Sequence, residues 1–251
     1  MVEERRIILK NLGRINPLDI NDYLAEGGYV TARKAVERAP VEIIDEMVNA
    51  SLRGRGGAGF STGLKKRFTS EACLRCEQKY LICNADEGEP GTFKDRIIME
   101  KDPHLLLEGM IIAAYAIGAS KAYIYIRGEY YRSINVLQKA LEDAGSNNFL
   151  GENIFGSDFS LDIEMKLGAG SYLCGEELTM LESLEGKRGY PRIKPPFPAE
   201  KGLYGLPTLI NNVETLAGIP SIIEHGAEWY KKTGTKDSPG TKIFTVRGDV
   251  N

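Results

Sequence analysis

The stretch YLICNADEGEPGTFKDR, residues 80–96, places a short apolar run directly before a turn rich in carboxylates. The run over 80–83 has the composition of a strand, and the glycines and proline that follow are typical of a turn. Outward from this stretch, helical spacing is expected over 41–52, 93–100, 103–117 and 130–144, and alternating strands over 121–127 and 161–167. This order predicts an α/β fold with an open, mostly parallel sheet, whose ligands bind in loops beyond the strand ends.

The order of the expected elements divides the chain into three parts. A helix is expected over 175–184, a proline-rich loop over 187–208, mostly helix over 209–232, and a new strand over 241–246. We therefore expect an N-terminal extension at 1–40, a main domain at 41–240 and the first strand of a truncated or split domain at 241–251.

Composition excludes several function classes. The 251 residues are 42% hydrophobic and 27% charged, as in soluble globular proteins, and 32 Lys and Arg against 35 Asp and Glu give a net charge of -3. No nucleic-acid partner is expected from that balance. No signal-peptide pattern is visible in the first residues, and the longest apolar stretch, 110–119, is shorter than the roughly 20 residues that span a bilayer. We expect a cytoplasmic chain without direct membrane insertion.

The four cysteines and two histidines do not predict a metal site within this chain. Cys73 and Cys76 form a lone CxxC, and Cys83 and Cys174 do not form a second one. A redox dithiol, a cluster shared with a partner and unligated surface cysteines stay open for the pair. The histidines lie in no metal-binding motif such as HExxH.

The segment GRGGAGFSTGLK, residues 54–65, matches the phosphate-binding pattern GxGxxG. A helix rather than a strand is expected before it, and it lacks the GK[ST] ending of a Walker loop, so neither nucleotide-binding fingerprint fits. It can form a backbone anion site with the cations of Arg55 and Lys65 at its edges. A plain flexible loop is the alternative.

Carboxylates and glycines follow two of the expected strands. Asp86, Glu87 and Glu89 could bind a divalent metal or accept hydrogen bonds from ribityl or ribose hydroxyls, and a solvated acidic turn is the alternative. In GAGSYLCGEE, residues 168–177, the glycines allow close approach of a flat ligand. Glu176 and Glu177 stand at the start of the expected helix, where carboxylates also serve as caps.

Two further segments have the chemistry of nucleotide contacts. The stiff loop PRIKPPFP, residues 191–198, presents Arg192, Lys194 and Phe197, which suit an adenine and a phosphate, or it is only a stiff linker. Asn211 and Asn212 open an apolar helical run and could cap it or contact a phosphate.

Five motifs, GRGGAGFSTGLK, NADEGEPGTFKDR, GAGSYLCGEE, KPPFPA and NNVET, occur in one order over 54–215. The chain from about residue 40 resembles the NADH-binding flavoprotein subunit of respiratory complex I and its relatives in NAD-linked hydrogenases and formate dehydrogenases. The resemblance implies a modified Rossmann-like domain that binds FMN and NADH, followed from 241 by a small β-grasp-like domain. It also implies FMN-dependent NADH dehydrogenase activity, by hydride transfer from nicotinamide C4 to flavin N5.

The resemblance implies site residues by position. Those matching FMN contacts are Gly54, Arg55, Gly56, Lys65, Asn84, Asp86, Glu87, Tyr172, Gly175, Glu176, Asn211 and Asn212. Those matching NADH contacts are Gly57, Phe60, Phe68, Glu89, Glu177, Lys194 and Phe197. Glu89 and Glu177 would orient ribose or carboxamide groups for catalysis, and acidic residues near the ribose favour NADH over NADPH.

The implied partners are a thioredoxin-like [2Fe-2S] subunit and further iron-sulfur subunits, which would hold the protein at the cytoplasmic side of a membrane. The ligands of the family's [4Fe-4S] cluster are absent from this sequence, and residue 66 is Lys where the family pattern has Trp. The alternative function is a non-catalytic nucleotide-binding or assembly fragment. Metal-dependent phosphotransfer is disfavoured because no Walker lysine or histidine base is evident.

Overall fold

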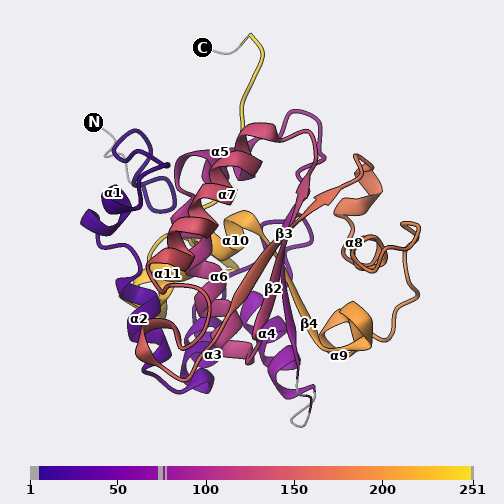
Figure 1. The fold of residues 1–251 in the computed structure, drawn as a ribbon, viewed down its shortest axis with the longest axis horizontal. Helices are drawn as coiled ribbons and strands as arrows, with labels where there is room; N and C mark the ends of the chain where they lie inside the picture. The colour runs from indigo at the N-terminus through magenta and orange to yellow at the C-terminus, as the bar shows by residue number, and fades with distance from the viewer. Residues whose placement is uncertain (1–5, 73–75, 77, 250–251) are drawn as a thin grey trace.

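The computed structural model describes residues 6–72, 76 and 78–249, and a four-stranded parallel sheet lies at its centre (Figure 1). The strands are β1 (Tyr80–Ala85), β2 (Lys121–Arg127), β3 (Asp162–Gly168) and β4 (Thr208–Asn212), in the order β3-β2-β1-β4. Tyr80 of β1 is in register with Lys121 of β2 and Thr208 of β4, so the carboxyl ends of the strands reach one edge of the sheet together. The predicted α/β class with a parallel sheet is confirmed.

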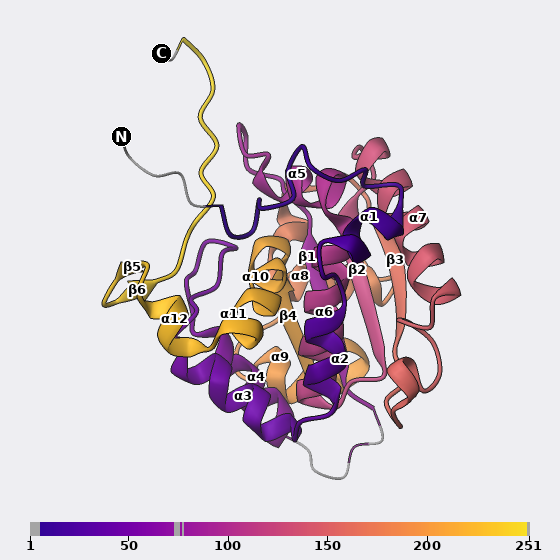
Figure 2. The same ribbon diagram turned by 90° about the vertical axis from the view of Figure 1, so that its left-hand side faces the viewer.

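Helices cover both faces of the sheet (Figures 1 and 2). The larger hydrophobic cluster lies on the face covered by α5 (Lys94–Lys101), α6 (Pro103–Ile117), α7 (Tyr131–Ser146), α10 (Val213–Ala217) and α11 (Ile219–His225). A smaller cluster on the opposite face joins Ile82, Tyr125 and Ile210 to α8 (Glu177–Leu184). The short α9 (Pro198–Lys201) lies beside β4 on that side (Figure 1). Alternate residues of β1 therefore enter different cores, which is typical of a sheet covered on both sides.

The central helix α6 is buried on nearly every side, and its ends follow its sequence. Asp102 caps the N-terminus by accepting a hydrogen bond from Leu105 N, Pro103 occupies the first turn, and Gly118 ends the helix in the left-handed conformation (φ 73°). Gly109 lets α10 approach, because an added Cβ would lie 2.0 Å from Leu216 O. No described helix is long and apolar enough to cross a membrane.

The described part of the N-terminal 40 residues packs into the main core. Helices α1 (Ile20–Ala25) and α2 (Val30–Val36) bury Tyr23, Tyr29 and Ala32 in the same cluster as α6. Asn11 Nδ2 donates to Asp102 Oδ2 at 2.8 Å, and Tyr23 OH donates to the buried Glu108. Next come α3 (Pro40–Asn49), which confirms the helix expected before the glycine-rich segment, and α4 (Thr62–Glu71).

Three elements differ from the sequence prediction. Helix α4 was not predicted, and β4 lies in a region expected to be loop and helix. Strand β4 is buried on both faces, so it lacks the alternation that marks a half-exposed strand. The strand predicted over 241–246 is wrong, because these residues pair with no described strand and Phe244 is 80% exposed. Only a short antiparallel pair, Gly234–Thr235 with Ser238–Pro239, and the helix α12 (Ala227–Lys231) precede them after α11 in the described chain.

The close approach at Gly109 makes a testable prediction. Gly109→Ala should lower the free energy of unfolding by about 1–3 kcal/mol, because the methyl group must displace the α10 backbone. Gly145→Ala is the matched control: Gly145 is exposed near the end of α7, has no neighbour within 4 Å of an added Cβ, and should give no loss. Urea denaturation of both variants measures the difference, and equal stabilities would contradict the assigned packing.

A second prediction concerns Asp102. Burial raises the pKa of its carboxyl to about 7, and the hydrogen bonds from Asn11 and Leu105 only partly offset this. The unfolded chain ionises at the ordinary value of 3.8, so the cost of the buried charge is absent below about pH 4, grows as pH rises, and is complete above about pH 7. Asp102→Asn should therefore raise the free energy of unfolding at about pH 8 by a few kcal/mol, on the order expected from such a shift.

The asparagine variant should match the original chain at about pH 3, where Asp102 is largely protonated in both the folded and the unfolded state. The amide also offers a donor to the buried Asn11 Oδ1, which has no hydrogen-bond partner within the described residues. Unfolding curves at several pH values measure the effect, and a stability difference independent of pH would refute the assigned ionisation.

Candidate functional site

Four of the predicted loops meet at the carboxyl edge of the sheet. Asn84 Nδ2 donates to Gly175 O at 2.8 Å, which joins the loop after β1 to the loop after β3. Tyr172 OH donates to Glu89 Oε2 at 2.9 Å across the same two loops. An added Cβ on Gly56 would lie 3.2 Å from Asn212 Cβ, so the glycine-rich segment lies against the end of β4. The structure therefore brings motifs from distant parts of the sequence into one surface region.

The glycine-rich segment presents bare backbone. The N–H groups of residues 56–59 donate to no described residue, and residues 56–58 are exposed. Gly57 and Gly59 have positive φ values of 117° and 66°, which L side chains rarely adopt. Ser61 then caps α4 by accepting from Leu64 N. Consecutive free N–H groups before a capped helix form the type of backbone site that binds an anionic oxygen.

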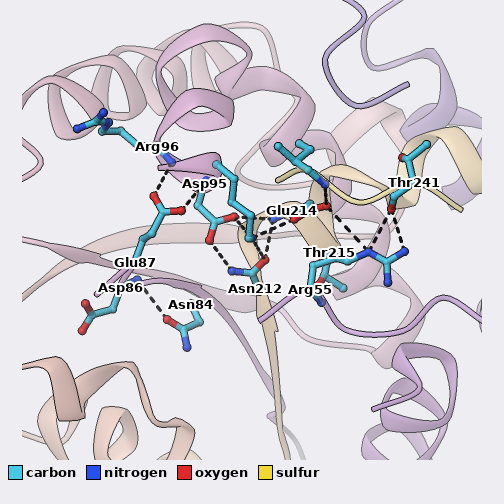
Figure 3. Close-up of polar contacts among 12 residues, drawn as sticks. Arg55, Asn84, Asp86, Glu87, Asp95, Arg96, Asn212, Glu214, Thr215 and Thr241 are labelled. Atoms are coloured by element: carbon cyan, nitrogen blue, oxygen red, sulfur yellow. Dashed lines mark hydrogen bonds and ion pairs between the residues drawn. The ribbon is translucent and has the colours of Figure 1, made fainter. Parts of the chain in front are cut away.

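A largely buried polar cluster joins the start of α5 to the start of α10, and we call Lys94, Asp95, Asn212 and Glu214 the Asp95 network. Figure 3 labels Asp95, Asn212 and Glu214 of this network. Lys94 Nζ lies 2.7 Å from Asp95 Oδ1 and 3.0 Å from Glu214 Oε2. Asn212 Nδ2 donates to Asp95 Oδ2 at 2.7 Å, and Asn212 Oδ1 accepts from Lys94 Nζ and from Glu214 N, which caps α10. Burial lowers the pKa of the Lys94 ammonium, but Asp95 and Glu214 outweigh it and the net pKa is raised.

Two predicted cofactor residues direct their charged groups inward. The Arg55 guanidinium is buried and donates to the carbonyl oxygens of Arg53, Pro239 and Thr241. Glu87 Oε1 and Oε2 accept from the backbone N–H groups of Asp95 and Arg96, at the start of α5. Both side chains hold the loops in place, so their charged groups are not directed at a cofactor in this conformation.

Asp86 differs from Glu87, its neighbour. Its carboxylate is partly buried and accepts no hydrogen bond from the described residues. Burial raises the pKa of Asp86 to about 6, opposed by the positive charge of Arg127. Figure 3 shows the Asp86 side chain directed away from the Asp95 network. A ligand N–H or hydroxyl would supply the donor that this carboxylate lacks.

Charged side chains from three segments of the chain meet at the start of α8. Lys65 Nζ lies 2.8 Å from Glu177 Oε2, and Lys194 Nζ lies 2.9 Å from Glu177 Oε1 and 3.5 Å from Glu176 Oε1. Glu176 also confirms its capping role, because it accepts from Leu178 N and Thr179 N. Burial raises the pKa of Glu177, but the two lysines outweigh it and the net pKa is lowered. Glu177 is thus held ionised as an acceptor.

Exposed aromatic side chains occur in the same segments. Phe60, Phe68, Phe197 and Tyr172 are between 49% and 67% exposed. Phe60 lies just before α4, Phe68 lies within α4, and Phe197 directly precedes α9. Such faces suit a stacked base or ring. The contacts of these four side chains with a ligand remain predictions.

Sequence reasoning missed Lys66 as a functional candidate. Its side chain is 0% exposed, and its Nζ donates to Asn211 Oδ1 at 3.2 Å. Burial, and then the charge of Lys65, lower the pKa of Lys66 to about 7. The available signal was the departure from the family pattern at position 66. Lys94, Asp95 and Glu214 were also missed as site residues, although they stand inside two of the five motifs.

The cysteine pair stays a prediction, because Cys73 lies outside the described residues. Cys83 and Cys174 are free and buried. Within the described ranges, no group of three or more His, Cys, Asp and Glu is arranged to hold a metal ion.

Comparisons with known proteins give relatives along almost the whole chain. An NADH-quinone oxidoreductase subunit of Aquifex aeolicus is 54% identical over 244 residues, which cover 97% of this chain and 57% of the relative. The NADP-reducing hydrogenase subunit HndC of Solidesulfovibrio fructosivorans is 49% identical over 248 residues, 99% of this chain and 50% of the relative. This chain therefore spans about half the length of these curated relatives.

A solved structure and a family model support the same relationship. A chain in the crystal structure of the NAD+-reducing [NiFe]-hydrogenase in the air-oxidised state superposes with a TM-score of 0.81 at 42% identity, covering 98% of this chain and 39% of that one. The family model described as the Nuo51 FMN-binding domain matches residues 47–221, a range that includes all five motifs. The chain belongs to the family of the Nuo51 FMN-binding domain.

Proposed function

We propose that this chain binds FMN and NADH at the carboxyl edge of the sheet and oxidises NADH by hydride transfer from nicotinamide C4 to flavin N5. The observation that supports this most is the convergence of the glycine-rich segment, the loops after β1 and β3, and the end of β4. The description of the family and the names of the relatives support the same cofactor and substrate.

The donor and acceptor groups fit FMN. The free N–H groups of 56–59 suit phosphate oxygens. The amides of Asn84, Asn211 and Asn212 each use one Nδ2 hydrogen within the protein, so the second hydrogen of each could donate to a ribityl hydroxyl or a ring edge. The carboxylate of Asp86 has no donor among the described residues, so a ring N–H would satisfy it. An added Cβ on Gly175 would lie 3.3 Å from Asp86 O, so a side chain there would crowd the loop after β1.

The proposed holding residues follow from these positions. FMN would be held by Gly54, Gly56, Lys65, Asn84, Asp86, Tyr172, Gly175, Glu176, Asn211 and Asn212, with Arg55 and Glu87 fixing the loops. NADH would contact Gly57, Phe60, Phe68, Glu89, Glu177, Lys194 and Phe197. The Phe side chains would give faces to adenine, and the two carboxylates would accept from ribose or carboxamide groups.

Bound FMN would supply the hydride acceptor, and the protein's part is to orient the two rings. Glu177 is fixed from two sides by Lys65 and Lys194, so its position is set before a ligand arrives. Electrons would then pass to iron-sulfur clusters of partner domains or subunits, including a thioredoxin-like [2Fe-2S] subunit. The relatives are themselves named as subunits, which supports an assembly of this kind.

FMN binding and reduction test the proposal. The purified chain, reconstituted with FMN under anaerobic conditions, should hold about one FMN per chain, and its visible flavin bands should bleach at near-stoichiometric NADH. Absence of FMN binding under any reconstitution would favour the non-catalytic assembly fragment. Bound FMN that stays oxidised after NADH addition would contradict the hydride step for this chain alone.

The role of Glu177 makes a separate prediction. Glu177→Gln should weaken NADH binding roughly tenfold or more, since a hydrogen bond to a charged group contributes about 1.5–3 kcal/mol, while FMN affinity changes little. Glu228→Gln is the control, because Glu228 is exposed and pairs with Lys231 on a helix outside the proposed contacts. Titration of each flavin-free variant with FMN, and of each FMN-loaded variant with NADH under anaerobic conditions, measures the two affinities. Unchanged NADH affinity in Glu177→Gln would rule out this role.

A further inference from the structure

Lys66 is a buried cation without a compensating carboxylate in the described part of the chain. Its ammonium has one hydrogen-bond partner there, the neutral amide of Asn211. By contrast, Lys65, Lys94 and Lys194 each lie within 3.0 Å of a carboxylate oxygen. Burying a lysine without a counter-charge disfavours folding, so an apolar residue would give a more stable protein at this position. Such costly groups are concentrated at functional sites.

The position of Lys66 relates it to the proposed FMN site. Helix α4, which holds Lys66, follows the glycine-rich segment directly. Asn211 is in register with Cys83 of β1, and the next pair along the strands is Asn84 with Asn212. The Lys66 ammonium is therefore hydrogen-bonded to Asn211, the residue directly before the end of β4, where the proposed cofactor residues lie.

Lys66 also fixes the orientation of the Asn211 amide. Asn211 Oδ1 accepts from Lys66, and Asn211 Nδ2 donates to Ile210 O at 2.9 Å. An amide nitrogen carries two hydrogens, so one donor of Asn211 is left for another partner. Without the lysine, the carbonyl end of this buried amide would lose its protein donor.

We propose that Lys66 is a positioning residue that stabilises reduced FMN relative to oxidised FMN, by fixing the Asn211 amide and by placing an uncompensated positive charge behind the cofactor. This inference rests on the proposed function. Hydride transfer moves two electrons and one proton from NADH to FMN and releases NAD+, so the reduced cofactor gains one negative charge. A buried cation interacts more strongly with that added charge than a solvated one does.

The ionisation of Lys66 agrees with this role. Its pKa is lowered to about 7 by burial and by Lys65, so the ammonium is only partly favoured in the ligand-free chain near neutral pH. Added negative charge nearby favours the charged form of a lysine. Reduction of FMN would therefore favour the charged form of Lys66 and strengthen its attraction to the reduced cofactor.

The experiment compares three variants of the whole chain with the original. Lys66→Met removes charge and hydrogen bond, Lys66→Gln keeps an amide donor but removes the charge, and Lys121→Met removes an equal charge from the opposite edge of the sheet, where Lys121 pairs with Asp162. For each protein, thermal unfolding without flavin, the affinity for oxidised FMN and the midpoint potential of bound FMN are measured.

We expect Lys66→Met to raise the unfolding temperature of the flavin-free chain and to weaken the binding of reduced FMN about tenfold more than that of oxidised FMN. That ratio lowers the midpoint potential by about 30 mV for a two-electron couple. Lys66→Gln should lower the potential similarly, and Lys121→Met should leave it unchanged.

An unchanged potential in both Lys66 variants would overturn the proposal, even if FMN binds more weakly, because a purely structural role affects both redox forms equally. A potential shift as large in Lys121→Met would also overturn it. If the original chain binds no FMN, the proposed function fails first and this inference fails with it, so the two failures are distinguishable.

Discussion

The ion pairs of Lys94 with Asp95 and Glu214 are the constraint on which the site depends. They are largely buried and join α5 to the junction of β4 and α10. Removing one member of a buried pair typically costs about 3–5 kcal/mol, since it leaves the other charge uncompensated. Through Asn212 the network reaches the glycine-rich segment, and through the N–H of Asp95 it reaches Glu87 in the loop after β1. Three loops are therefore held relative to one another by one cluster.

Glu214 of this cluster, together with Arg55, also holds the start of the extended segment 241–246, which pairs with no described strand. Glu214 Oε1 accepts from Ile243 N at 2.9 Å, and the Arg55 guanidinium donates to Thr241 O at 2.9 Å. Side chains thus satisfy backbone groups that a strand partner would otherwise satisfy. The strand over 241–246 was predicted from the sequence pattern alone, and a sequence pattern cannot show whether a neighbouring strand is available.

Strands β1 to β3 and helices α5 to α7 could be predicted because their apolar residues form runs, or recur at strand or helix spacing, where the element is buried. Strand β4 and helix α4 could not, since TLINN alternates too little and TGLKKRFTSE has little apolar content. For the site, the motifs identified the loops that meet, including Lys65 with Glu177. They could not distinguish Asp86 from Glu87, because adjacent carboxylates in a turn have identical sequence signals and opposite surroundings.

The charged groups at this edge fall into two kinds with different consequences. Lys65, Lys94 and Lys194 are paired with carboxylates, so they fix shape before a ligand binds. Asp86 and Lys66 have no counter-charge of this kind among the described residues, and burial moves the pKa of each towards neutrality, to about 6 and about 7. A folded protein keeps such costly groups only where something else compensates them. A ligand with N–H donors for Asp86 and developing negative charge for Lys66 meets both requirements, and a flavin that accepts a hydride is such a ligand.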